Sequence, residues 1–164
     1  MSYLIAEDSS DLRVDFLEVD NANLSTNIFS FISPANFNTN IQTSTTNITL
    51  FSGSSYYLEC SPFLQTSNQN GAITWQFYDE TNATFIGQNA YLNLVTNTGA
   101  APRVGRRVCS ALIVDSDIEA GKSIDVGVRI VSITGTNWVF DPKTLPSHIQ
   151  HVGWPTVRIM QLPS

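Results

Sequence analysis

The stretch that decides the fold is GAITWQFYDETNATFIG, residues 71–87. Its apolar residues Ile73, Trp75 and Phe77 alternate with polar or hydroxyl-bearing residues, and successive side chains of an extended chain point to opposite faces. Residues 79–82, Asp-Glu-Thr-Asn, favour turn geometry, and Phe-Ile at 85–86 resumes an apolar return strand. The stretch therefore predicts a β-hairpin with its turn at 79–82.

Similar patterns recur along the chain. The clearest alternation is at 124–133, whereas 108–114 is apolar almost throughout and predicts a strand buried on both faces. Small residues within the latter, Ser110 and Ala111, indicate a place of close approach. Further strands are expected at 48–51, 56–61, 91–95 and 154–162. No stretch has a capped apolar stripe at helical spacing, so the chain predicts an all-β antiparallel sandwich or jelly roll of eight to ten strands.

Charge is unevenly distributed. The formal net charge of −6 argues against a nucleic-acid partner, which would require a basic face. Between Asp20 and Asp79, Glu59 is the only Asp, Glu, Lys or Arg. Strands with uncharged polar surfaces pair easily at their edges, because charged edge residues are what normally prevents it. We infer that another copy of the chain or a partner covers much of this segment.

The N-terminal region, residues 1–45, differs from the domain expected at 46–164. Residues 1–20 contain six acidic residues and one arginine, yet apolar residues alternate there as in a strand: Leu12, Val14 and Phe16. Two interpretations are open, an acidic arm that docks on a neighbouring protein and a first edge strand of the same domain. No apolar run is long enough for a signal peptide or a membrane span, so we expect synthesis in a cytosol and no membrane partner.

A family resemblance rests on six segments taken in order. They are YYLE at 56–59, AITWQFYD at 72–79, FIG at 85–87, SALIV at 110–114, IDVGVRI at 124–130, and Trp154 leading into VRI at 157–159. This order resembles the strands of C1q/TNF-like jelly rolls, most of all those of bacteriophage virion proteins. The resemblance covers roughly residues 46–162 and implies a ten-stranded sandwich, a trimer with a threefold interface built by one sheet, and a virion setting. It brings no catalytic residue.

Cysteine and histidine residues offer little chemistry. Cys60 and Cys109 lie in predicted strands and could meet, but two thiols are too few for a disulfide framework, and a reducing compartment favours buried thiols. His148 and His151 are three residues apart, which on a helix could share a metal ion. Neighbouring prolines exclude a helix and no third zinc ligand is supplied, so a solvated loop is favoured.

Acidic residues suggest one further site. Asp115, Asp117 and Glu119 followed by Gly121 resemble the start of a calcium-binding loop, but the later bidentate glutamate is missing, which favours an acidic turn. No nucleophile elbow, phosphate loop or kinase signature is present. We therefore expect no catalytic, cofactor-binding or metal-binding residue, and no enzyme.

Partner contacts have four candidate residues. Arg103, Arg106 and Arg107 form the only basic cluster, which suits a solvated loop or a subunit contact better than a phosphate site. Trp138 is the best candidate for an aromatic residue that faces a ligand such as a glycan.

These observations together predict a non-enzymatic, trimeric structural protein of a bacteriophage virion, made in the host cytoplasm. The preferred role is capsid decoration, as a cement protein that binds the major capsid protein and stabilises the shell. The alternative is a host-recognition or fibre-tip module that binds a cell-surface glycan through loops at 97–107 or 134–153. A small hydrolase remains only if His148 and His151 bind a transition metal.

Overall fold

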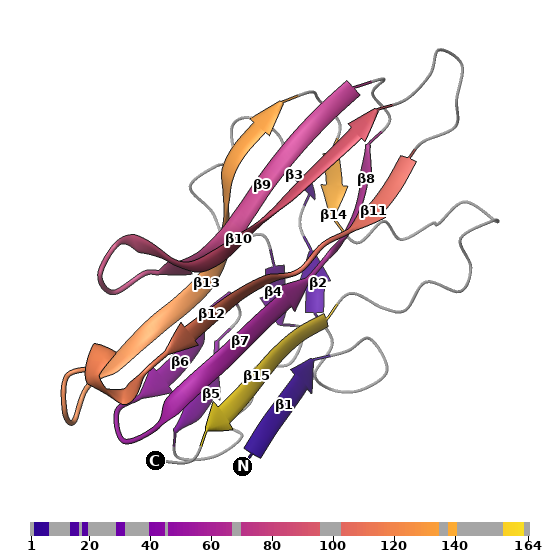
Figure 1. Ribbon diagram of the computed structural model, residues 1–164. Coiled ribbons are helices and arrows are strands. Elements are labelled where there is room, and N and C mark those ends of the chain that lie inside the picture. The colour runs from indigo at the N-terminus through magenta and orange to yellow at the C-terminus, as the bar shows by residue number, and fades with distance from the viewer. Residues whose placement is uncertain are drawn as a thin grey trace.

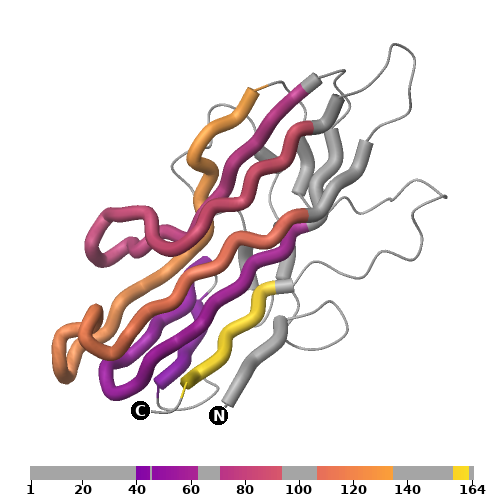
Figure 2. Tube along the Cα trace, in the orientation of Figure 1, coloured from indigo at the N-terminus to yellow at the C-terminus, as the bar shows by residue number. Residues whose placement is uncertain are grey.

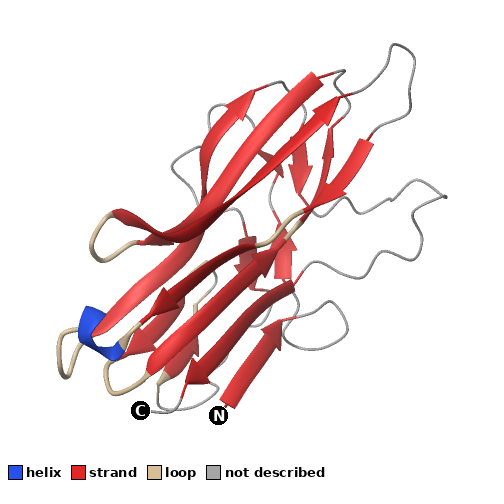
Figure 3. Ribbon diagram, in the orientation of Figure 1, coloured by secondary structure: helices blue, strands red, loops and turns tan. Residues whose placement is uncertain are grey.

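The computed structural model describes residues 40–44, 46–66, 70–95, 103–134, 138–140 and 156–162, together with four short strands nearer the N-terminus. Side chains are described for 40–44, 46–62, 71–93, 107–134 and 157–162. The described residues form β-strands and one turn of 3-10 helix, η1 (Asp115–Asp117), as Figure 3 shows. The strands are β1 (Ser2–Ala6), β2 (Val14–Phe16), β3 (Glu18–Val19), β4 (Phe29–Phe31), β5 (Ile41–Thr43), β6 (Ile48–Phe51), β7 (Ser55–Ser61), β8 (Phe63–Thr66), β9 (Asn70–Asp79), β10 (Thr84–Val95), β11 (Arg103–Arg106), β12 (Cys109–Ile113), β13 (Ser123–Thr134), β14 (Trp138–Phe140) and β15 (Thr156–Leu162).

The main sheet is antiparallel and strongly curled into a half-barrel (Figures 1 and 2). Eight strands form it in the order β15-β7-β12-β10-β9-β13-β6-β5, and β1 pairs with β15 as a ninth. Only one residue pair, Gln88 and Ser110, joins β10 to β12. The sheet therefore consists of two halves, β1-β15-β7-β12 and β10-β9-β13-β6-β5, connected at a narrow point.

The strand pairs are nested around one hairpin. The innermost pair is β9 and β10, and outside it along the chain follow β8 with β11, β7 with β12, β6 with β13, β3 with β14, and β1 with β15. Four of these pairs lie in the main sheet, where β9–β10 and β6–β13 belong to one half and β7–β12 and β1–β15 to the other, whereas β8–β11 and β3–β14 lie in a smaller sheet. The pairing is thus nested about the β9–β10 hairpin.

The predicted hairpin is the innermost pair, with its turn at residues 80–83. The buried carboxylate of Asp79 fixes this turn. Its Oδ1 accepts the backbone N–H groups of Thr81 and Asn82, each at 2.9 Å, and its Oδ2 accepts the Asn82 amide at 2.7 Å. Ile73, Trp75 and Phe77 are buried, as their alternation predicted.

The return strand differs from its prediction. Residues 91–95 were expected as a separate strand, but they continue β10, with a register shift between Ile86 and Ala90. The shift contains Gly87, whose φ of +73° is a conformation that side-chain-bearing residues rarely adopt. A β-bulge bends its strand, and here the bend brings β10 against Ser110 and Ala111. The close approach predicted from these two small residues is confirmed.

The short turn at Ser52–Ser54 has a different role from a hairpin turn. The strands on either side, β6 and β7, were both predicted, but they do not pair with each other. Instead the turn carries the chain from one half of the sheet to the other. The Tyr56 hydroxyl stabilises this crossing, because it lies 2.6 Å from the carbonyl oxygen of Phe51 and 3.2 Å from that of Asn40.

One hydrophobic core fills the inner side of the curled sheet. The largest fully buried side chains come from both halves: Trp75, Tyr56, Phe77, Ile41, Ile48, Leu50 and Leu58. In β13 the predicted alternation is confirmed, with Ile124, Val126, Val128 and Ile130 buried. Val157 and Ile159 of β15 share the buried face, also as predicted. Each such side chain contributes about 1.5–3 kcal/mol by leaving water, so the core explains why the halves stay together.

Two smaller sheets complete the described strands. One has the order β11-β8-β14-β3, and the other pairs β2 with β4. Within the acidic first twenty residues, the segments placed in strands are therefore β1, β2 and β3.

Candidate self-association surface

Strand β12 has one buried side and one exposed side. Cys109, Ala111 and Ile113 face the core, as expected. Leu112, however, is 57% exposed, and the flanking Val108 and Val114 are 50% and 40% exposed. The prediction that 108–114 is buried on both faces is therefore wrong for the single chain, because no element of the described structure covers the outer side.

Apolar side chains continue outward across the neighbouring strands. Leu112 lies opposite Tyr57 of β7, which in turn lies opposite Met160 of β15. Tyr57, Met160 and Leu162 are half-buried. The term apolar face is used below for the outer side of β12, β7 and β15, made by Val108, Leu112, Val114, Tyr57, Met160 and Leu162.

The charges beside the apolar face neutralise each other. Glu59 of β7 pairs with Arg158 of β15, with 3.1 Å between Oε2 and Nη1. The Tyr57 hydroxyl donates to the other carboxylate oxygen of Glu59 at 3.2 Å. Glu59 is the single charged residue between Asp20 and Asp79, and this ion pair neutralises its charge within the chain.

The outer side of the second half has a different character. Tyr78 and Phe85 contact each other edge to face with 5.0 Å between ring centroids, and the guanidinium carbon of Arg129 lies 3.9 Å from the Tyr78 centroid. Arg129 also forms a two-bond ion pair with Glu80. These polar groups have partners within the chain, and this half also exposes the large hydrophobic residues Phe85, Tyr91 and Val131.

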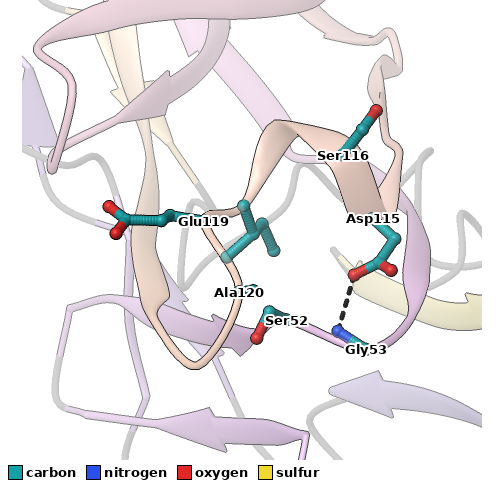
Figure 4. A pocket seen from close by; sticks show the side chains of 7 residues that line it. Ser52, Gly53, Asp115, Ser116, Glu119 and Ala120 are labelled. Atoms are coloured by element: carbon teal, nitrogen blue, oxygen red, sulfur yellow. Dashed lines mark hydrogen bonds between the residues drawn. The ribbon is translucent and has the colours of Figure 1, made fainter.

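A depression at one end of the sheet contains the acidic turn (Figure 4). The Asp115 carboxylate accepts the backbone N–H of Gly53 at 2.6 Å, and Asp117 accepts that of Val114 at 3.0 Å. Glu119 points away from Asp115 in Figure 4. The predicted turn is confirmed, and the hydrogen bonds that the two aspartates accept stabilise it. Among residues whose surroundings the structure describes, no group of three His, Cys, Asp or Glu side chains is placed to hold a metal ion.

The structure aligns two of the four predicted contact residues. Arg103 of β11 and Trp138 of β14 both lie opposite Thr66 of β8, so they occupy one row of the smaller sheet. Arg106 ends β11 opposite Phe63, and Arg107 follows it as an exposed residue. Their roles as contacts remain predictions. His148 and His151 lie outside the described residues, as do most of the loop segments proposed for glycan binding.

No protein-family model matches the chain, and no curated protein matches it. Within the described part of the chain, no helix has the length and apolar character needed to span a membrane.

Sequence reasoning missed the residues that make the apolar face. Tyr57, Leu112 and Met160 form one row, but this depends on which strands are neighbours, and β15 is far from β7 in sequence. The apolar pattern of residues 108–114 was a signal for this face, because such a pattern predicts a strand that is buried on both sides. The pattern was assigned wholly to the chain's own core.

Proposed function

We propose that this chain is a non-enzymatic structural protein that assembles as a homotrimer through its apolar face, in the role of a capsid decoration protein of a bacteriophage virion. The observation that carries the proposal is the row Leu112, Tyr57 and Met160 on the outer side of β12, β7 and β15.

The proposal includes a jelly-roll fold, which the strand pairing supports. A jelly roll arises when one long antiparallel hairpin folds over, so that its strand pairs are nested and alternate between two sheets. Among the nested pairs from β9–β10 out to β1–β15, the four that lie in the main sheet alternate between its two halves in this way. The narrow junction at Gln88 and Ser110 is where the two sheets of such a sandwich would separate.

The apolar face supports self-association. Apolar residues that gather on the outer side of a sheet are typical of a site for protein contact, and burying an exposed leucine contributes up to about 1.5–3 kcal/mol. Glu59 and Arg158 on this side pair with each other, so neither charge needs a partner from a second copy.

A pair of aspartate variants tests the assembly surface. Leu112→Asp would bury a carboxylate at the interface and is expected to convert the trimer to monomers. Val131→Asp is the matched control, because Val131 is an exposed apolar residue of β13 in the other half, 41% exposed. Sedimentation velocity of both variants checks the result, and equal association of the two would contradict the choice of surface.

The virion role needs its own experiment. Many equivalent trimers on one shell could bind firmly even when each contact is modest, which suits a decoration protein. The purified chain is expected to bind shells assembled from the major capsid protein encoded in the same genome. It should also raise the temperature at which those shells rupture. Binding to host cells but not to shells would contradict this role.

A host-recognition module is the second candidate, favoured by the row that holds Arg103 and Trp138. An aromatic ring and a guanidinium group are both common in glycan sites, since the ring stacks on sugars and the cation binds carboxylates. A glycan-array signal that disappears in Trp138→Ala and persists in Leu112→Asp would favour this candidate.

A further inference from the structure

The two cysteines occupy opposing positions in the sheet. Cys60 of β7 and Cys109 of β12 are direct partners in the antiparallel register. Both residues are fully buried, and no disulfide joins them. Their alignment depends on pairing between strands on either side of the central hairpin, so the sequence alone could not establish it.

The register gives a separation that a disulfide can span. Directly opposed residues in antiparallel strands have Cα atoms about 4.5 or 5.5 Å apart, depending on the pair type, and disulfides accept about 4.4–6.8 Å. Opposed Cβ atoms are about 4.5–5.5 Å apart, while disulfides require about 3.5–4.5 Å. A bridge would thus close with a small inward movement and retain some strain.

The cysteine pair lies at one end of the β7–β12 ladder, where a small oxidant can reach the sulfur atoms. Cys109 is the first residue of β12, so Cys60 and Cys109 form the last rung at that end of the β7–β12 ladder. Arg107 and Val108, which precede it, are exposed. Terminal rungs open at lower free energy than central ones, so a small oxidant can reach the sulfur atoms without global unfolding.

We propose that Cys60 and Cys109 form a cross-strand disulfide site that is a dithiol in reducing surroundings and closes on exchange with a small-molecule disulfide. One cysteine loses its thiol proton, and the resulting thiolate attacks a sulfur of glutathione disulfide. This releases one glutathione thiolate, which takes up the proton. The second cysteine thiolate then attacks the mixed disulfide and releases the second glutathione. The strain of a cross-strand bridge makes it readily reducible, so the site is reversible.

The bridge would link the two strands that carry most of the apolar face. Leu112 of β12 and Tyr57 of β7 lie three rungs from the cysteine pair. Closing the bridge fixes the relative position of these strands at one end. This inference concerns the chain's own covalent chemistry, so it does not rest on the trimer or on the virion role.

The experiment exposes the folded, reduced chain to glutathione disulfide, quenches with acid, and alkylates free thiols after denaturation. Mass spectrometry of the intact chain is expected to show a species lighter by two hydrogens that resists alkylation and returns to the dithiol with dithiothreitol. A peptide map should contain a crosslinked peptide with Cys60 and Cys109. Full alkylation of both cysteines, stable glutathione adducts or interchain dimers would each overturn the proposal.

A register-shifted variant provides the matched control. Cys109→Ser combined with Ser110→Cys keeps two cysteines, but position 110 lies opposite Glu59 and on the other face of the strand. The wild type is expected to form at least about fivefold more intrachain disulfide than this variant, because only its pair has the required geometry. Equal yields from the two chains would show that the register does not matter and would overturn the proposal.

Discussion

A Cβ atom at Gly87 would lie 2.1 Å from the carbonyl oxygen of Ser110. The same atom would lie 2.6 Å from the Cα atom of Ala111, so the obstruction is backbone and cannot rotate away. This is where the two halves of the main sheet are joined by hydrogen-bonded strands, through Gln88 and Ser110. The absence of a side chain at Gly87 is therefore a condition for the curl of the sheet.

Gly87→Ala should accordingly be one of the most destabilising single substitutions in the chain. The expected loss is about 3 kcal/mol or more, since a backbone clash adds to the cost of a positive φ. Gly121→Ala is the control, because its φ of +76° is similar and nothing lies within 4 Å of the added atom. It should lose only about 1–2 kcal/mol. Urea unfolding of both variants measures the difference, and equal losses would contradict the close approach.

The central hairpin gives a second prediction, at Asp79. Asp79→Ala removes the acceptor of three hydrogen bonds in the turn and should destabilise the chain by about 2–3 kcal/mol. Asp79→Asn retains an acceptor oxygen for Thr81 and Asn82 and should lose about half as much. Thermal unfolding distinguishes the variants. If Asp79→Asn were as damaging as Asp79→Ala, charge rather than hydrogen bonding would hold the turn.

Tyr56 gives a prediction about alkaline pH. Burial raises the pKa of its phenol above the ordinary value of 10.0, and the negative charge of Asp115 adds to this rise. In the unfolded chain the phenol loses its proton at lower pH than in the folded chain. Its contribution to stability is therefore fully present below about pH 10 and falls as the pH rises further.

The comparison with Tyr56→Phe isolates this effect from other groups that titrate at high pH. At pH 7 the variant should be less stable by about 1–2 kcal/mol, because the carbonyl oxygens of Phe51 and Asn40 lose a donor. Above pH 10 the difference between the two proteins should shrink. Urea unfolding between pH 7 and 11 tests this, with exposed Tyr91→Phe as a control that should match wild type at pH 7. A difference that grows with pH would contradict it.

Local patterns predicted the strands well, because alternation in one segment depends only on that segment. The alternation of Ile73, Trp75 and Phe77 predicted the buried face of β9, and the alternation of apolar residues in β13 predicted the buried face of that strand. Which strands are neighbours depends on contacts between distant segments. Sequence reasoning therefore placed Tyr57 and Leu112 in strands but could not place them side by side.

The bulge in β10 was missed for a related reason. The sequence predicted two separate strands, at 85–86 and 91–95, on either side of Gly87. Its function becomes clear only from Ser110 and Ala111 on the adjacent strand. The same two residues had indicated close approach, but the segment that approaches them could not be identified without the fold.

The central claim is that the outer side of β12, β7 and β15 is covered by other copies of the chain. The most direct test is the native mass of the purified wild-type protein at micromolar concentration, measured by light scattering coupled to size-exclusion chromatography. We predict a particle of three times the chain mass of 18.0 kDa. A particle with the mass of one chain would contradict the account.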